Sequence, residues 1–222
     1  MLTVLVMPNY SENPILTVND EEYKMLIEVC EEFEKQKNDK ISHDGYGTPT
    51  EIVIRNHLLG KKLNLSKNHR VRIQGSKIDI DLLLLKNDVD PNQEIYVPEN
   101  VKMVIEVKNN GVPGKIMENG KQEDPNKVLR FKFNELEAIA KVKNFAVIVL
   151  SETLLPPKSP YKWRFKEEMI GKKNCKVFTL VARQLYPLGG LYVKSNIESM
   201  LQNGKIKKTG EFQRLISYLQ NL

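Results

Sequence analysis

Two apolar runs in the middle of the chain carry charged side chains. Residues 78–85 read Ile-Asp-Ile-Asp-Leu-Leu-Leu-Leu, and residues 104–108 read Val-Ile-Glu-Val-Lys. A carboxylate inside such a run needs a partner, an ion or water, because burying an unpaired charge is costly. Acids on two neighbouring strands supply the hard oxygen ligands that Mg²⁺ prefers. The two runs therefore indicate a divalent metal beside an attacking water, which is nuclease chemistry.

The alternation of side chains along a strand decides which of these groups can meet. Residues two apart share a face, so Asp79 and Asp81 point together. Glu106 and Lys108 share a face for the same reason. If the two runs pair, one aspartate lies opposite Glu106, and this pair could hold Mg²⁺. The metal would neutralise charge on phosphorus and lower the pKa of a water, while Lys108 would orient that water or stabilise the developing charge.

The tripeptide Glu-x-Lys carries little information by itself. Glu22-Tyr23-Lys24 has the same pattern but lies in a segment with helical periodicity. Residues 106–108 instead end an apolar strand, follow a second strand that carries acids, and precede a helix. The alternative interpretation is an edge strand with a solvated Glu–Lys pair, which leaves Asp79 and Asp81 unexplained.

The elements around these residues follow from hydrophobic periodicity and turn residues. Helices are predicted at residues 20–38, from Thr48 onward, at 126–142 and at 210–221. Strands are predicted at residues 70–74, 77–86, 101–108, 145–150 and 176–181. The strand–helix–strand order from residue 101 to residue 150 predicts a right-handed crossover between parallel strands.

Residues 44–150 resemble the PD-(D/E)xK nuclease superfamily, the fold of many restriction endonucleases. The resemblance lies in the order helix, three strands, helix, strand, with Asp81 followed by Glu106-Val107-Lys108. It implies an α/β protein with a restriction-endonuclease-like core, in which helices flank a central mixed sheet of four to five strands. It also implies that Asp81 and Glu106 bind Mg²⁺, with Mn²⁺ able to substitute, and that Lys108 is their catalytic partner.

The resemblance leaves two assignments open, namely which aspartate binds the metal and whether Glu51 is catalytic. Asp79 could replace Asp81 as the metal ligand, but the unbroken apolar run directly after Asp81 favours Asp81. Glu51 could add a catalytic carboxylate from the first helix of the core, as in some members of the superfamily. Glu51 could equally be a favourable acid near the positive end of a helix dipole.

Basic residues outside this set are candidates for contacts with nucleic acid. Lys127 and Arg130 lie on the helix that follows the site. Lys162 and Arg164 lie in a segment that mixes cations and aromatics, a composition suited to backbone contacts and base stacking. A solvated helix face and a loop anchored by its tryptophan are the simpler alternatives. The net charge of +6, with acidic residues concentrated near the N-terminus, leaves a basic body that suits DNA.

Length and composition limit the other classes of protein to which this chain could belong. With 222 residues and 41% hydrophobic content, the chain can bury a substantial core. We expect an N-terminal helical extension (1–43), the nuclease core (44–151) and a completion of the same domain (152–222). No apolar run approaches the roughly 20 residues of a membrane span, and Cys30 and Cys175 give neither a disulfide framework nor a metal pair. A cytoplasmic protein without membrane contact is expected.

The function expected from the sequence is a Mg²⁺-dependent endonuclease that hydrolyses DNA, of the restriction type that acts against foreign DNA. A repair or resolvase nuclease of the same fold is one alternative, and substrate preference would separate it. A catalytically inactive module that binds nucleic acid is the other, although intact Asp81, Glu106 and Lys108 argue against it. The pattern does not choose between DNA and RNA. A homodimer would suit double-strand cleavage.

Overall fold

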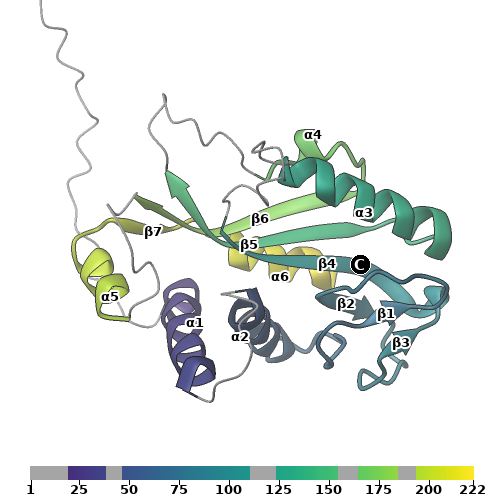
Figure 1. Cartoon of the computed structure of the whole chain (residues 1–222), viewed down its shortest axis with the longest axis horizontal. Coiled ribbons are helices and arrows are strands. Elements are labelled where there is room, and N and C mark those ends of the chain that lie inside the picture. The colour runs from purple at the N-terminus through teal and green to yellow at the C-terminus, as the bar shows by residue number, and fades with distance from the viewer. Residues whose placement is uncertain (1–19, 39–46, 111–123, 155–164, 185–193) are drawn as a thin grey trace, which may run out of the picture.

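A mixed five-stranded sheet with helices on both faces organises the chain (Figure 1). The computed structural model describes residues 20–38, 47–110, 124–154, 165–184 and 194–222. The sheet has the strand order β2-β4-β5-β6-β7. Its strands are β2 (Leu82–Leu85), β4 (Val101–Asn110), β5 (Phe145–Leu154), β6 (Cys175–Gln184) and β7 (Ile206–Lys208). The predicted α/β class and the predicted mixed sheet flanked by helices are confirmed.

Strand directions follow from the connections. β4, β5 and β6 are parallel neighbours, and β2 and β7 are antiparallel strands at the two edges. The helix α3 (Pro125–Ala140) connects β4 to β5, which confirms the predicted parallel pair on either side of a helix. Leu82 pairs with Ile105. Because β2 and β4 are antiparallel, the residue before Leu82 lies beside Glu106.

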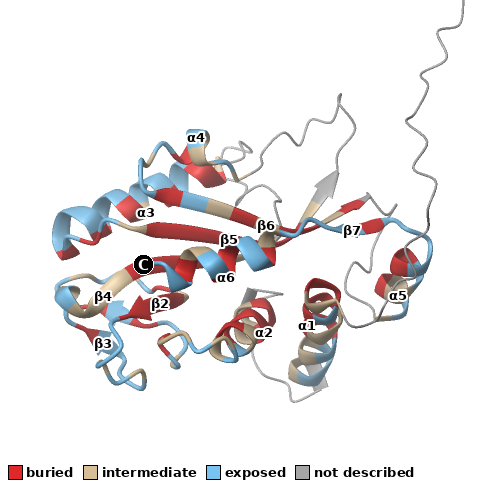
Figure 2. Cartoon of the chain, turned by 180° about the vertical axis from the view of Figure 1, so that it is seen from behind, coloured by how far each residue is buried: buried red, intermediate tan, exposed pale blue. Residues whose placement is uncertain are grey.

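The middle of the sheet is buried, as the red stretch of β5 in Figure 2 shows, and buried side chains lie on both of its faces. In β2 the side chains alternate between two cores, with Leu82 and Leu84 in one and Leu83 and Leu85 in the other. The first core lies under α1 (Glu21–Asn38), α2 (Gly47–Leu59), α5 (Lys194–Gln202) and α6 (Glu211–Gln220). The second lies under α3 and the short α4 (Glu167–Ile170). A strand buried on both faces explains why the run of leucines lacks alternation.

The helix α3 shows how the sequence sets a helix that carries a site residue. Asp124 caps its first turn by accepting a hydrogen bond of 2.9 Å from the backbone N–H of Asn126. Its buried stripe consists of Leu129, Phe133, Leu136 and Ala140. Lys132 lies three residues after Leu129 and four before Leu136, so it shares the side of the helix that faces the sheet.

The strand predicted at residues 77–86 is shorter than expected. β2 begins at Leu82, because the preceding residues turn away from β4 and Ile80 instead bridges to Val71. Gly75 makes this reversal with a φ of +85°, a conformation that favours glycine. A small parallel pair, β1 (Arg72–Ile73) with β3 (Ile95–Tyr96), lies beside it, and a 3₁₀ turn (Pro98–Asn100) leads into β4.

The helix predicted at residues 20–38 is observed as α1, and it belongs to the main core. Met25, Leu26 and Val29 are fully buried in the same cluster as Ile54 of α2. Among the described residues, no helix is long and apolar enough to cross a membrane.

Candidate active site

The structure brings Asp81 and Glu106 together at the start of β2. The backbone N–H of Val107 donates a hydrogen bond of 2.8 Å to Asp81 Oδ2. From α2, Arg55 Nη2 donates to the backbone carbonyl of Asp81 at 3.1 Å. The aspartate is therefore fixed through its carboxylate and through its backbone, next to the buried carboxylate of Glu106.

Lys108 links the two acids. Its Nζ donates to Glu106 Oε2 at 3.0 Å and lies 3.8 Å from Asp81 Oδ2. Burial by itself would raise the pKa of Glu106, but the ammonium groups of Lys108 and Lys132 hold that pKa below its ordinary value. Burial would lower the pKa of Lys108, yet the charges of Glu106 and Asp81 raise it. The pair is thus a carboxylate and an ammonium at neutral pH.

Glu51 adds a third carboxylate from α2. Burial, reinforced by the charge of Asp81, raises the pKa of Glu51 to about 8. Burial, reinforced by the charge of Glu106, raises the pKa of Asp81 to about 6. Both shifts have the same origin, since several carboxylates share a poorly solvated space. A cation among them would lower this electrostatic cost.

Buried polar atoms without a hydrogen bond gather at the same place. Among the described residues, the buried side-chain nitrogen and oxygen atoms without a hydrogen bond are Glu51 Oε2, Arg55 Nε and Glu106 Oε1. Glu51 Oε2 has an ion pair with His69 Nδ1 at 2.8 Å, and Glu106 Oε1 has one with Lys132, but neither contact has hydrogen-bond geometry. Buried polar atoms are normally hydrogen-bonded. Their concentration at one place marks it as a site for a ligand, ion or water.

The structure favours Asp81 over Asp79 as the acid beside Glu106. The Asp79 carboxylate is partly exposed and accepts a hydrogen bond of 2.7 Å from Arg72 Nε, which lowers its pKa. Only its backbone carbonyl faces the site, where it accepts a hydrogen bond of 2.7 Å from Lys132 Nζ.

The donor set suits a magnesium-like ion held by few protein ligands. Within the described ranges, no group of three or more His, Cys, Asp or Glu side chains is arranged to hold a metal. Mg²⁺ usually takes one or two carboxylates and fills its octahedron with waters and phosphate oxygens. Asp81 and Glu106 supply the two carboxylates of that smaller requirement.

Three residues that lie in the site were not predicted as site residues from the sequence. Lys132 had a readable signal, since a lysine on the inward side of a helix requires an acidic partner. Arg55 lies one helical turn after Glu51, which is also readable once α2 is placed against the site. His69 lies in a connecting loop, and no pattern in the sequence predicts its contact with Glu51.

The basic residues that the sequence suggests for nucleic-acid binding differ in their contacts in the structure. Arg130 donates through Nε to the carbonyl of Ile170 at 2.7 Å and through Nη2 to that of Met169. These bonds hold its guanidinium at the end of α4, and its contact with phosphate stays a prediction. Lys127 is exposed, with its Nζ 6.0 Å from the ring centroid of Phe131. Lys162 and Arg164 lie outside the described residues.

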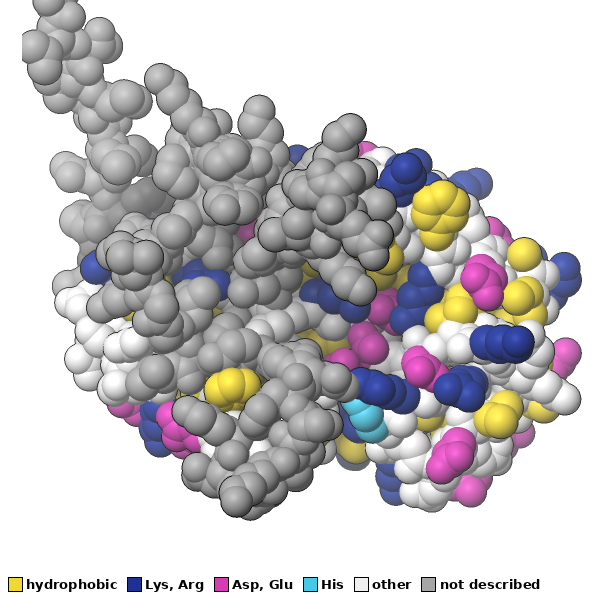
Figure 3. Space-filling view, in the orientation of Figure 1, with side chains coloured by type: hydrophobic (Ala, Val, Ile, Leu, Met, Phe, Trp, Pro, Cys, Tyr) yellow, Lys and Arg dark blue, Asp and Glu magenta, His cyan; other side chains and the backbone are white. Residues whose placement is uncertain are grey.

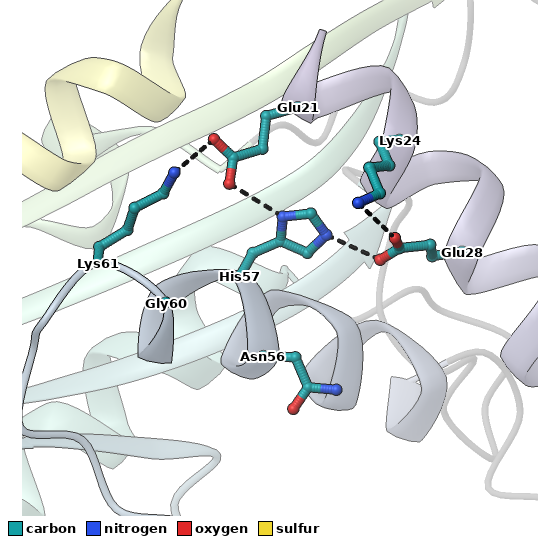
Figure 4. A pocket seen from close by; sticks show the side chains of 7 residues that line it. All are labelled: Glu21, Lys24, Glu28, Asn56, His57, Gly60 and Lys61. Carbon is teal, nitrogen blue, oxygen red and sulfur yellow. Dashed lines mark hydrogen bonds and ion pairs between the residues drawn. The ribbon is translucent and has the colours of Figure 1, made fainter. Parts of the chain in front are cut away.

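A second polar cluster lies between α1 and α2 in a pocket of about 610 Å³ (Figure 4). The ring of His57 lies between two carboxylates, with Nδ1 3.1 Å from Glu21 and Nε2 2.8 Å from Glu28. Lys61 bonds Glu21 at 2.7 Å, and Lys24 lies 3.6 Å from Glu28. Each carboxylate here has a lysine or imidazole partner, and the contacts of His57 and Lys61 link α2 and the residues after it to α1.

The surface charge is mixed around these elements. Figure 3 shows acidic side chains set among Lys and Arg side chains on the face seen in Figure 1.

Comparison with protein-family models, with curated proteins and with solved structures finds no match for this chain. The functional argument therefore depends on the residues of the site and on their geometry.

Proposed function

We propose that this chain is a divalent-cation-dependent nuclease of the PD-(D/E)xK type that hydrolyses phosphodiester bonds in DNA. The observation that carries the proposal is the convergence of Asp81, Glu106 and Lys108 at a place where buried polar atoms lack hydrogen bonds. The two carboxylate oxygens among these atoms, Glu51 Oε2 and Glu106 Oε1, have ion pairs but no contact of hydrogen-bond geometry, so a cofactor or substrate could still bind them.

Each side chain has a role that follows from its contacts. Asp81 and Glu106 would hold Mg²⁺ or Mn²⁺, which when bound would supply charge neutralisation at phosphorus and activation of water. Lys108, kept as an ammonium by two acids, orients the attacking water and stabilises the charge that develops on the phosphate. Arg55 and the N–H of Val107 hold Asp81 in place.

Glu51 is the candidate for proton transfer. Burial and the neighbouring carboxylates raise the pKa of Glu51 in the metal-free protein, and a carboxyl group with a raised pKa can hold or release a proton near neutral pH. Its Oε2 atom is buried and lies 2.8 Å from His69 Nδ1. Its place one turn before Arg55 keeps it beside the two acids rather than in solvent.

The substrate class is supported by charge and by chemistry. A net charge of +6 favours a polyanion, and cleavage of foreign DNA in the cytoplasm is the role we propose. A repair or resolvase nuclease would use the same residues on a different DNA shape. A two-fold dimer would place two such sites on the two strands of a duplex.

A cleavage assay on a panel of substrates tests the proposal. Purified protein with Mg²⁺ or Mn²⁺ is incubated with unmodified, methylated and branched DNA, and with RNA of the same sequence. We expect nicking or cutting of at least one DNA, and preference for the branched form would favour the repair or resolvase alternative. Survival of every substrate with both metals would contradict the nuclease function.

A further inference from the structure

Glu106 has a different lysine on each carboxylate oxygen. Lys108, from the same strand, donates to Oε2, and Lys132, from α3, pairs with Oε1. The Glu106 side chain is 2% exposed, and that of Lys132 is 21% exposed. One acid is therefore balanced by two ammonium groups drawn from separate elements.

The two lysines are held differently. Lys108 lies between Asp81 and Glu106, so both acids retain it. Lys132 pairs with Glu106 alone among these acids, and its hydrogen bond goes to the backbone carbonyl of Asp79 at 2.7 Å. Leaving Oε1 would cost Lys132 one ion pair, while the carbonyl could still hold it at the edge of the site.

Glu106 Oε1, the oxygen that pairs with Lys132, is one of two buried carboxylate oxygens in the described residues that have no contact of hydrogen-bond geometry. Since Glu106 Oε2 already accepts a hydrogen bond from Lys108, a divalent ion bound by Asp81 and Glu106 would need Oε1, and two cations cannot share that oxygen at ion-pair distance without strong repulsion. Lys132 and the ion therefore compete for one position.

We propose that Lys132 is a built-in competitor for the divalent cation. Its ammonium neutralises Glu106 when the ion is absent and leaves Oε1 when the ion binds. Lys132 thus sets the cation concentration at which the site fills. This inference rests on the proposed function, because it requires that Asp81 and Glu106 bind a metal.

Competition by Lys132 predicts effects on metal affinity and stability that differ from those of a purely structural lysine. Removing the ammonium in Lys132→Gln takes away the competitor, so Mn²⁺ binds more tightly. The same substitution leaves Glu106 with less neutralisation, so the metal-free protein becomes less stable. With saturating Mn²⁺ that loss disappears. A residue that only packs α3 against the sheet would weaken metal binding and destabilise both forms.

Calorimetric titration with Mn²⁺ alone, without DNA, measures this. We expect Lys132→Gln to bind Mn²⁺ roughly tenfold more tightly than the wild type, the effect of removing one partly buried ion pair. Lys132→Arg, which keeps the charge, should return the affinity toward that of the wild type. Lys127→Gln makes the same charge change on the exposed side of α3 and should alter the affinity little.

Melting curves in EDTA and in Mn²⁺ complete the test. A Lys132→Gln protein that melts below the wild type in EDTA and level with it in Mn²⁺ supports the competition. Equal or weaker Mn²⁺ binding by Lys132→Gln, with the wild type binding through Asp81 and Glu106, overturns the inference and leaves the proposed function standing. A wild type that binds no Mn²⁺ overturns both.

Discussion

Asp81 and Val107 are joined by a hydrogen bond of 2.8 Å from the backbone N–H of Val107 to Asp81 Oδ2. Val107 is the middle residue of the Glu-x-Lys tripeptide, so this bond fixes the aspartate of one strand against the acid and the lysine of the next. The same tripeptide in α1, Glu22-Tyr23-Lys24, lies on a helix, and its contact with a strand is made by a side chain, since Tyr23 Oη accepts a hydrogen bond of 3.0 Å from the backbone N–H of Lys208 in β7. The bond between strands gives the tripeptide its chemical meaning.

Asp81→Asn should make the protein more stable while abolishing DNA cleavage. The folded-state pKa of Asp81 is raised to about 6, above the ordinary 3.8, so ionising this carboxylate costs stability as the pH rises through that window. An amide avoids the cost and can still accept the bond from Val107. We expect a gain of about 1 to 2 kcal/mol in the free energy of unfolding at pH 7. Urea unfolding at pH 7 and pH 4 measures it, and a loss of stability at pH 7 would count against this origin of the shift.

Glu51 should make stability fall between about pH 5 and pH 8. Its pKa is raised from 4.5 to about 8, so over this window the folded state keeps a proton that the unfolded state has lost. The free energy of unfolding therefore decreases with pH, and the stability present below pH 4.5 is lost as the pH rises through the folded-state pKa. In Glu51→Gln this part of the pH dependence should disappear, which unfolding curves at several pH values would reveal. An unchanged slope in the variant would contradict the assignment.

Mn²⁺ should stabilise the folded protein, and the effect should grow from pH 6 to pH 8. Protons compete with the metal for Asp81, whose pKa is about 6, so less competition remains at higher pH. At a hundredfold excess over Kd, binding adds about 2.7 kcal/mol. Thermal melts with and without EDTA measure the shift. Asp79→Asn should keep it and Asp81→Asn should lose it, whereas the reverse pattern would reassign the ligand to Asp79.

Arg130 and Lys127 form a matched pair on α3 for separating structure from binding. Arg130→Ala removes two bonds to the end of α4 and should cost about 1 to 3 kcal/mol of stability, with no change in the salt dependence of DNA binding. Lys127→Ala should leave the melting temperature unchanged. If Lys127 contacts a phosphate, its removal weakens binding and lowers the salt slope by about one. If Arg130→Ala instead lowers the salt dependence of DNA binding, Arg130 contacts a phosphate.

Much of the fold could be predicted because its signals are local. The amphipathic stripe of α3, with Leu129 and Phe133, and the apolar runs of β4 and β5 depend on residues close in sequence. The start of β2 could not be predicted in this way. Residues 77–81 have strand-like alternation, but the turn at Gly75 and the bridge from Ile80 to Val71 divert them. The elements α4, α5, β7 and β3 are short, and their limits are set by packing rather than by periodicity.

The site could be predicted where its residues lie on strands, because side chains alternate between the two faces of a strand. Glu106 and Lys108 share a face by alternation, and Asp81 follows from the antiparallel register. Contributions from helices depend on how each helix docks on the sheet, which sequence spacing does not specify. Glu51, Arg55 and Lys132 therefore reach the site through tertiary packing.

The nicking rate of supercoiled plasmid in Mn²⁺, compared between Lys108→Met and Lys24→Met, tests the central claim most directly. Both lysines end a Glu-x-Lys tripeptide, but only Lys108 lies against Asp81 and Glu106, whereas Lys24 pairs with Glu28 on the surface. We predict that Lys108→Met nicks at least about 100-fold more slowly than the wild type, and that Lys24→Met stays within about twofold of it. A Lys108→Met protein that nicks at the wild-type rate would contradict the assignment of this site.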